Sequence, residues 1–430
     1  MRKEEKPYDF EDVDPKRDRV DPDQFLPRDK KLSLDQQRAV EMACEMEYPI
    51  VGITGGAGTG KTTVLGALYK ELRAARRRVV VAAPTGRAAK RVTELTKIPA
   101  ITIHRLLEYP QPDQDLEGNM MPNEPSRNRQ RPLEAQVVII DESSMVSPTL
   151  YGQIMDALPR GSVVRFIGDN NQLPPVEEGK PPFIDVLERY PSVVLHFNYR
   201  SQDDIVSNAG RILRGMIPKA NDRFHILYTN DMVSGLLDFV TGSKEFARDD
   251  HQIIIPARKG RYGTLRVNPS LQLKFNPRGD VLHLDRYDEK EKPLTVRGGD
   301  KFLWIKNDYK LNMFNGEIGR IADLDSEQGW LKLRTTDREI LVEPRIKTYS
   351  SYHGFVIDYD PRKQIELGYA ITTHKSQGSE FDVVVLAMTG NMAFLLNRRN
   401  FYTAVTRAKR EVYIITDRLG MTRAMRPYKG

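Results

Sequence analysis

One short stretch constrains the fold of this chain more than any other, residues 53–63, which read ITGGAGTGKTT. Its spacing is that of a phosphate-binding loop, and the pattern rests on Gly55, Gly60, Lys61 and Thr62. The apolar run at 49–53 predicts a buried parallel strand before the loop. Residues 63–73 place apolar side chains on one helical face after it. A strand, a glycine-rich loop and a helix in this order predict an α/β fold.

The chemistry of this loop follows from its backbone. Four glycines in six residues, Gly58 and Gly60 among them, let main-chain N–H groups curl around phosphate oxygens. The helix that begins near Thr63 adds partial positive charge at the same point. Lys61 is expected to reach the β- and γ-phosphates, and the Thr62 hydroxyl to hold Mg²⁺. A plain glycine-rich turn is the alternative, and the flanking strand and helix argue against it.

Composition limits the class of protein. The 430 residues provide for two to four domains with a sizeable core. A net charge of +7 favours a polyanionic partner, although many basic proteins bind no nucleic acid. The single cysteine, Cys44, excludes an internal disulfide and fits a reducing compartment as a small core residue. No apolar run approaches a membrane span, and we expect no signal peptide.

A second predicted strand, residues 79–83, leads into a basic helix. Loops at the carboxyl ends of such strands are where α/β sheets bind ligands. Pro84, Thr85 and Arg87 lie in this loop, where Thr85 and Arg87 are suited to grip a nucleic-acid backbone. A solvated basic helix is an equally good interpretation of this segment alone. His104, after another short turn, is by itself more typical of a structural histidine.

The most informative segment after the phosphate loop is VVIIDE at 137–142. Four β-branched residues predict a central strand, and two carboxylates end it. Asp141 is placed to hold Mg²⁺ through water, and Glu142 to orient the water that attacks the γ-phosphate. An Asp-Glu pair ending a strand is common by chance, but its combination with Lys61 favours phosphoryl-transfer chemistry.

Two segments interrupt the α/β pattern. Residues 1–30 are charged and rich in proline, which predicts a mobile arm. Residues 108–134 are polar and carry a turn signal at 117–119. Met120 and Met121 follow that turn, and apolar side chains in a polar loop either pack on the adjacent core or press on a base pair.

Residues 163–169 predict a further buried strand, which leads into GDNNQLPPV at 168–176. With this segment the chain resembles the superfamily 1B helicases of the RecD-like and Dda-like type. DESSM at 141–145 and GDNNQLPPV match motifs II and III of that family, the phosphate loop matches motif I, and the segment around Gln36 matches the Q motif. Residues 195–201, 371–380 and 401–409 resemble motifs IV, V and VI. The resemblance extends over residues 32–417.

The resemblance implies an α/β fold of two RecA-like parallel-sheet motor domains with ATP between them, plus a β-hairpin insertion and an SH3-like β-barrel insertion. The implied boundaries are a 1–30 arm, a first motor domain at 31–107 and 135–195, a hairpin wedge at 108–134, a second motor domain at 196–270 and 366–430, and the barrel at 271–365. Short predicted strands at 301–305, 318–324, 330–333 and 339–342 independently favour a β-rich insertion. Residues 253–255 and 383–386 predict buried strands of the second domain.

The resemblance also implies roles for single residues. Gln36 would read adenine and Tyr199 would stack on it, while Gln172, Arg200 and Arg407 would contact the γ-phosphate. The remaining implied nucleotide contacts are Gly58, Gly60, Lys61, Thr62, Thr63, Gly378 and Glu380, with Thr62 and Asp141 at the metal. The implied nucleic-acid contacts are Pro84, Thr85, Arg87, Thr102, His104, Thr373 and His374, with Met120 and Met121 as the wedge.

We therefore expect an ATP-dependent, Mg²⁺-requiring 5′-to-3′ helicase that acts on single-stranded and fork DNA. A single-strand translocase or remodelling subunit with weak unwinding is one alternative. An ATP-controlled clamp is another, and intact Lys61, Asp141, Glu142 and Arg407 argue against it. The resemblance further implies a monomer in the cytoplasm of a bacterial or phage-infected cell, with replication or recombination proteins as partners and no membrane association.

Overall fold

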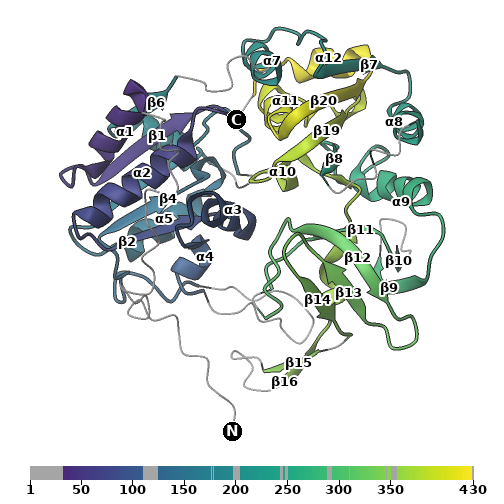
Figure 1. The fold of residues 1–430 in the computed structure, drawn as a ribbon, viewed down its shortest axis with the longest axis horizontal. Helices are drawn as coiled ribbons and strands as arrows, with labels where there is room; N and C mark the ends of the chain where they lie inside the picture. The colour runs from purple at the N-terminus through teal and green to yellow at the C-terminus, as the bar shows by residue number, and fades with distance from the viewer. Residues whose placement is uncertain are drawn as a thin grey trace.

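The chain forms two parallel-sheet cores and a group of antiparallel strands (Figure 1). The structure is a computed structural model, and it describes residues 32–109, 124–175, 177, 179–196, 204–242, 246, 250–287, 293–308, 310–344, 346–349 and 356–428. The 1–30 arm, Met120 and Met121, Tyr199 and Arg200 lie outside the described residues, as does the turn expected at 117–119. Within the described part, no helix has the length and apolar character that crossing a membrane requires.

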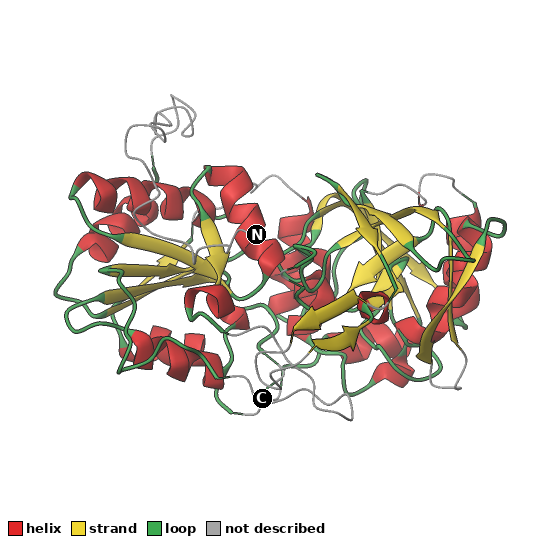
Figure 2. Cartoon of the chain, turned by 90° about the horizontal axis from the view of Figure 1, so that it is seen from below, coloured by secondary structure: helices red, strands yellow, loops and turns green. Residues whose placement is uncertain are grey.

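The first core is a parallel sheet with helices on both of its faces (Figure 2). Its strands are β1 (Ile50–Gly55), β2 (Val79–Ala83), β3 (Ala100–Thr102), β4 (Val137–Ile140), β5 (Val163–Gly168) and β6 (Ser192–Leu195). Their spatial order is β3-β2-β4-β5-β1-β6, and all pairings are parallel. Because β4, β5 and β1 are neighbours, the loops that follow them leave the same edge of the sheet side by side.

The helices of the first core cover the sheet with the apolar faces expected from the sequence. They are α1 (Leu34–Cys44), α2 (Lys61–Ala74), α3 (Gly86–Thr96), α4 (Ile103–Leu106), α5 (Pro148–Ala157) and α6 (Pro182–Arg189), with a short 3₁₀ helix η2 (Ser143–Met145). Leu65, Leu68 and Leu72 of α2 are almost completely buried and pack in one cluster with Ile53. Each fully buried side chain of this size contributes about 1.5–3 kcal/mol, so α2 fixes the phosphate loop firmly against the sheet.

A buried arginine ties the end of α1 to the sheet. Arg165, in the middle of β5, is fully buried, and its guanidinium donates to the carbonyl oxygens of Ala43 at 2.6 Å, Glu45 at 2.7 Å and Tyr48 at 2.9 Å. Burial of this cation lowers the pKa of Arg165 to about 10. A buried charge is tolerated because it is hydrogen-bonded. Cys44, expected as a core residue, is half-buried against the same apolar cluster.

The second core is a smaller parallel sheet in the order β18-β8-β19-β20-β7. Its strands are β7 (Phe224–Tyr228), β8 (His251–Ile254), β18 (Ala370–Ile371), β19 (Phe381–Ala387) and β20 (Ala408–Thr416). Its helices are α7 (Asp204–Leu213), α8 (Met232–Thr241), α9 (Thr264–Phe275), α10 (Thr373–Ser376), α11 (Arg398–Val405) and α12 (Arg418–Ala424), with the 3₁₀ helix η5 (Gly390–Met392). The chain therefore leaves this core after α9 and returns to it at β18.

Antiparallel strands fill the interval between α9 and β18. A five-stranded sheet has the order β14-β13-β12-β11-β17, and two-stranded ribbons pair β9 with β10 and β15 with β16. The bounds are β9 (Val281–Tyr287), β10 (Pro293–Arg297), β11 (Lys301–Trp304), β12 (Ile318–Leu324), β13 (Leu331–Arg334), β14 (Glu339–Val342), β15 (Ile346–Tyr349), β16 (Val356–Tyr359), the 3₁₀ helix η4 (Pro361–Gln364) and β17 (Ile365–Leu367). Phe302 and Trp304 of β11 share one continuous apolar cluster with the second core, so this inserted sheet is anchored to that core.

The elements fall slightly to one side of two expected boundaries. Helix α9 runs across position 270, and β17, which straddles 365/366, pairs with β11 of the inserted sheet. In the described part of the 108–134 insertion, residues 124–134 contain no strand, so the expected hairpin is not seen there.

Candidate nucleotide cleft and strand-contacting residues

A cleft of about 440 Å³ lies between the two cores, at the edge where the loops after β1 and β4 emerge. Side chains from both cores line it, which makes it a site that depends on their docking. Most residues expected at a nucleotide meet there: Gln36, Gly58, Gly60, Lys61, Thr62, Thr63, Asp141, Glu142, Gln172, Glu380 and Arg407.

The phosphate loop has the backbone that its glycines predict. Gly58 and Gly60 both have φ of 80°, a left-handed conformation that favours glycine. A Cβ at Gly55 would collide with the Thr59 hydroxyl, so this position also needs glycine. The Lys61 ammonium donates to the carbonyl oxygens of Gly55 at 2.8 Å and Gly56 at 3.0 Å. The cation is thereby held at the mouth of the loop, beside the N-terminus of α2.

The two carboxylates that follow β4 differ in environment. Burial, followed by the charge of Glu142, raises the pKa of Asp141 to about 6, although Lys61 opposes the shift. Glu142 has a φ of 49°, and its Oε2 is buried with no hydrogen-bond partner among the described residues. Positive φ at a non-glycine residue is uncommon, and strained backbone of this kind clusters at functional sites. The arrangement keeps one carboxylate oxygen open toward the cleft.

The donor set fits Mg²⁺. The Asp141 carboxylate and the Thr62 hydroxyl line the same cleft and are hard oxygen donors. Across the described residues, no group of three or more His, Cys, Asp and Glu side chains could hold a metal. Mg²⁺ usually takes one or two carboxylates and completes its shell with water and substrate phosphates, so this sparse set suits a nucleotide-bound ion.

Gln172 brings a second open acceptor into the cleft. It is buried, its Nε2 donates to Asp169 Oδ2 at 3.4 Å, and its Oε1 has no hydrogen-bond partner among the described residues. Gln172 follows β5, which explains its place beside the carboxylates that follow β4. A buried amide oxygen without a donor is costly, and it fits a position meant for a bound water or ligand.

The second core supplies a buried cation. Arg407 is 4% exposed and donates from Nε to Thr403 O at 3.1 Å and from Nη1 to Ser379 O at 3.3 Å. Glu380 pairs instead with Arg91 of α3 at 2.5 Å. This ion pair joins the two cores across the cleft, and it could not be predicted from the sequence, because a basic helix alone does not reveal its partner.

Gln36 and Gly378, both expected at the nucleotide, differ in where they lie. Gln36 lines the cleft, but its amide is used locally: Oε1 accepts from Ser33 N at 3.1 Å in a capping box, and Nε2 donates to Thr59 O at 3.1 Å. Gly378 does not line the cleft. It has a φ of 72° and lines an adjacent cavity of about 400 Å³ between α3, the inserted sheet and the second core.

The threonines expected to touch a nucleic acid are mostly helix caps. Thr85 and Thr102 are the N-caps of α3 and α4, and their hydroxyls accept from Ala88 N at 3.2 Å and Arg105 N at 3.1 Å. Thr373 is fully buried, with its hydroxyl donating to Asn400 Oδ1 at 2.9 Å. Helix α10 is capped by the preceding Thr372, and Thr373 therefore points inward.

Arg87 faces the other domains. Its guanidinium lies 5.3 Å from the ring centroid of Phe381 and donates to Gly316 O at 3.2 Å. Burial lowers the pKa of Arg87 to about 10. Arg87 thereby makes a contact that joins the first core, the second core and the inserted sheet. Pro84, just before the α3 cap, is half-buried.

The two histidines of the candidate strand track lie near α4 and α10. Burial lowers the pKa of both His104 and His374, so both are neutral near pH 7. The His104 ring centroid lies 4.9 Å from that of Tyr109 with the two rings tilted by 50°, and its Nδ1 is buried without a hydrogen-bond partner among the described residues. Neutral imidazoles can hydrogen-bond a phosphate or sugar but add no charge.

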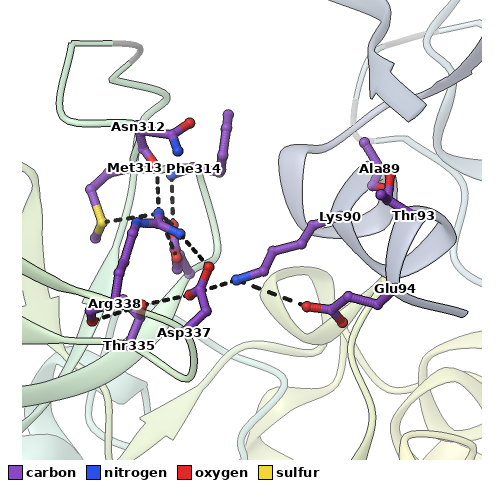
Figure 3. A network of polar contacts seen from close by, with 11 residues as sticks. Ala89, Lys90, Thr93, Glu94, Asn312, Met313, Phe314, Thr335, Asp337 and Arg338 are labelled. Atoms are coloured by element: carbon purple, nitrogen blue, oxygen red, sulfur yellow. Dashed lines mark hydrogen bonds and ion pairs between the residues drawn. The ribbon is translucent and has the colours of Figure 1, made fainter. Parts of the chain in front are cut away.

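Helix α3 also binds the inserted sheet through a polar network (Figure 3). The Lys90 ammonium lies 2.7 Å from Asp337 Oδ1, and Asp337 Oδ2 pairs with Arg338 at 2.9 Å. Arg338 in turn pairs with Glu317 at 3.0 Å. A Cβ at Gly86 would collide with the ring of Phe314, so the loop before β12 packs directly on the start of α3. Helix α3 therefore contacts both the inserted sheet and the second core.

Other residues that join the cores were not predicted. Tyr402 and Thr403 of α11 and Gln377 after α10 all make hydrogen bonds to the first core. They fall inside motifs V and VI, so the signal was present, but motif position alone does not tell which side chains cross an interface.

Comparison with known proteins finds relatives among DNA helicases. Residues 31–235 match the family described as AAA domain, and 367–415 match the UvrD-like helicase C-terminal domain. The chain is 30% identical to the ATP-dependent RecD2 DNA helicase of Deinococcus radiodurans, over 90% of this chain and 50% of that protein. It is 26% identical to the RecBCD enzyme subunit RecD of Mycobacterium tuberculosis, over 89% of this chain and 68% of that one.

The fold has solved counterparts. The Pif1 helicase from Bacteroides in complex with ADP-AlF3 and ssDNA has a TM-score of 0.59 at 22% identity, covering 93% of this chain and 95% of that one. The Pif1 helicase from Candida albicans has a TM-score of 0.57 at 20% identity. The present chain spans half the length of the Deinococcus relative. In its ordered motifs, its two matched domains and these relatives, the chain is similar to the RecD-like helicases.

Proposed function

We propose that this chain is an ATP-dependent DNA helicase that moves 5′-to-3′ on single-stranded DNA and separates duplex. One observation carries the proposal: Lys61, Asp141 and Glu142 of the first core face Arg407 of the second core across one cleft. Phosphoryl transfer needs a cation at the phosphates, a metal anchor, a group that orients water and an arginine that stabilises the transition state. The four side chains supply one candidate for each part.

In this proposal, residues on both cores have defined roles in hydrolysis. Lys61 and the loop amides neutralise the phosphates, Thr62 and Asp141 hold Mg²⁺, and Glu142 orients the attacking water. Gln172, Arg407 and Arg200 contact the γ-phosphate, and Tyr199 stacks on the base. Bound Mg²⁺ would neutralise charge on the phosphates. Because Arg407 comes from the other core, hydrolysis would loosen the docking, and alternate docking and release would move the strand.

The finer architecture is part of the same proposal. The antiparallel strands between α9 and β18 would form the SH3-like barrel, and the 108–134 insertion the hairpin wedge, with Met120 and Met121 at its separating edge. The two parallel-sheet cores would be the motor domains, with limits near those expected from the sequence. Fork DNA, replication or recombination proteins, a monomeric state and a bacterial or phage-infected cytoplasm complete the proposed setting.

The direction of movement rests on the forms of motifs V and VI, which resemble those of 5′-to-3′ enzymes. The test is unwinding of two duplexes that differ only in carrying a 5′ or a 3′ single-stranded tail. We expect ATP-dependent opening of the 5′-tailed duplex alone, with Lys61→Ala as the inactive control. Opening of the 3′-tailed duplex instead would overturn the polarity. Strand-stimulated ATPase without opening of either duplex would favour the translocase alternative.

A further inference from the structure

Tyr402 reaches from the second core to the phosphate loop of the first. It lies on α11, is 3% exposed, and its hydroxyl donates to Asp169 Oδ2 at 2.7 Å. The same hydroxyl accepts from Ala57 N at 3.3 Å. A Cβ at Gly56 would lie only 3.1 Å from this oxygen, so the loop admits the hydroxyl closely because it has no side chain there. One hydroxyl thus bridges the phosphate loop and the segment after β5.

Asp169 makes this bridge relevant to the cleft. Its carboxylate is completely buried, so it needs hydrogen-bond donors. Asn171 N donates to Oδ1 at 3.0 Å, while Gln172 Nε2 at 3.4 Å and the Tyr402 hydroxyl at 2.7 Å share Oδ2. The Tyr402 bond is the shorter of the two on Oδ2. The oxygen that orients Gln172 is therefore held mainly by a residue of the other core.

The hydroxyl of Tyr402 keeps its proton. Burial, followed by the charge of Asp169, raises the pKa of Tyr402 well above its ordinary value. The group therefore stays a donor to the carboxylate and an acceptor for the loop amide throughout the working range of pH. Both roles end when the cores separate, because Tyr402 travels with α11.

We propose that Tyr402 is a positioning residue for ATP hydrolysis: on docking of the second core, its hydroxyl fixes the Ala57 N–H and, through Asp169, the Gln172 amide that faces the γ-phosphate. The inference rests on the proposed function and adds how docking of the second core changes the positions of groups at the nucleotide. Helix α11 would then contribute to the site twice, through Tyr402 and through Arg407, which follows the helix in the chain.

Neighbouring bonds provide a natural comparison. The Thr403 hydroxyl accepts from Leu173 N at 2.9 Å, and Gln377 Nε2 donates to Leu173 O at 2.9 Å. Both bonds join the cores, yet both are made to the backbone of Leu173, and neither involves Asp169 or the phosphate loop. Thr403→Val therefore removes a docking contact of similar kind while leaving the link to Gln172 in place.

The test measures ATP hydrolysis at saturating single-stranded DNA in Tyr402→Phe, Thr403→Val and Tyr413→Phe. The Tyr413 hydroxyl donates to Glu411 at 2.7 Å on the same strand, β20, so its loss controls for removing a tyrosine hydroxyl. In Tyr402→Phe a buried acceptor loses its donor, and we expect kcat to fall about 5–150-fold. The affinity for ADP, which has no γ-phosphate, should stay near that of the unchanged protein.

Two outcomes would overturn the positioning role. One is a kcat of Tyr402→Phe equal to that of Tyr413→Phe. The other is a loss in Tyr402→Phe that matches Thr403→Val in kcat, KM and ADP affinity, which would make Tyr402 a docking contact only. The double variant Tyr402→Phe with Gln172→Ala sharpens the test, because residues that act in series lose no more together than Gln172→Ala alone. Multiplied losses would contradict the relay.

Failure of the proposed function has a different signature. In that case the unchanged protein would show no strand-stimulated ATPase at all, and Tyr402→Phe would have nothing to alter. An active unchanged protein with an unaffected Tyr402→Phe variant would instead reject the positioning role and leave the proposed function intact.

Discussion

The nucleotide cleft and the candidate strand track, which comprises the residues expected to contact a nucleic acid, differ in how their side chains are used in the folded chain. In the cleft, the expected side chains point at a common space, and Glu142 and Gln172 keep open acceptors there. In the track, Thr85 and Thr102 cap helices, Thr373 is buried and Arg87 binds the other domains. Catalysis at phosphates needs specific side chains, whereas a sequence-independent grip on a strand is available from backbone amides and helix N-termini. The same kind of motif therefore specifies side chains in one region and local backbone geometry in the other.

The largest effect is expected when the charged side chains of the cleft are replaced. Lys61→Ala and Glu142→Gln should both abolish strand-stimulated ATP hydrolysis, but for different reasons. Loss of the Lys61 cation should weaken ATP binding, because phosphate charge is no longer neutralised. Loss of the Glu142 carboxylate should leave ATP bound, because only orientation of water is lost. Steady-state ATPase and equilibrium nucleotide binding separate the two.

Glu188→Gln is a matched control for Glu142→Gln, because Glu188 is an exposed carboxylate paired with Lys180 on the outer side of α6. Its ATPase should equal that of the unchanged protein. Near-normal turnover in Glu142→Gln would remove this residue from the proposed mechanism.

The next effect concerns the contribution of the second core. Arg407→Ala should preserve ATP binding and lower kcat by about 10³-fold, toward the lower end for arginine fingers, because Arg200 is a second candidate cation. Arg410→Ala is the control, since Arg410 lies on β20, just after Arg407, but is exposed and only weakly paired with Asp382 at 4.0 Å. If the kcat of Arg407→Ala equalled that of the control, Arg407 would not contribute its charge to ATP hydrolysis.

A smaller effect tests the track itself. If the Thr85 hydroxyl acts as a cap, Thr85→Ser should keep both stability and strand affinity, while Thr85→Val should lower the free energy of unfolding by about 1 kcal/mol. Thermal unfolding and fluorescence anisotropy with labelled single strands measure the two quantities. A Thr85→Val variant that loses strand affinity with unchanged stability would restore direct contact.

The logarithm of the binding constant for single strands should fall linearly with the logarithm of the salt concentration, with a slope of about −0.7 per phosphate neutralised. The binding constant should depend little on the sequence of the strand. The slope in Thr85→Ser should equal that of the unchanged protein, because the cap carries no charge. Binding that ignores ionic strength would contradict a backbone-tracking groove.

The smallest effect is expected at the contact between α3 and the inserted sheet. Partial burial of Asp337 would raise its pKa, but hydrogen bonds from Lys90 and Thr335 outweigh it and lower the pKa to about 2, from an ordinary value near 3.8. A lowered carboxyl pKa gives stability that is present above pH 3.8 and lost only as the pH falls toward 2. The Lys90–Asp337 pair should therefore respond to salt but not to pH in the neutral range.

Asp337→Asn should lower the free energy of unfolding by only about 0.2–1 kcal/mol, as for other partly exposed ion pairs. Glu339→Gln is the matched control, because Glu339 pairs with Lys332 and Arg334 inside the inserted sheet and does not reach α3. Denaturant unfolding at low and high salt measures the difference. A larger salt-dependent loss in the control than in Asp337→Asn would contradict a contact between α3 and the sheet.

Local sequence determined the framework of this protein. The apolar runs predicted β2 and β4 to the residue, the glycines predicted the phosphate loop, and the acidic pair after β4 was expected beside Lys61. These features follow from short-range rules, because parallel strands deliver their carboxyl ends to one edge whatever lies around them. The family resemblance then predicted that a second core follows the first in the chain and that the two face each other across the nucleotide.

Tertiary structure alone decided which way individual side chains point. Whether Thr372 or Thr373 caps α10, where Arg87 finds its acceptor, and that Tyr402 rather than a neighbour meets Asp169 all depend on contacts between segments far apart in the chain. A motif records which residues are present, but a shift of one position at a helix start rotates a side chain by about 100°. The sequence therefore determined where the site lies, and the packing of three bodies determined which side chains serve it.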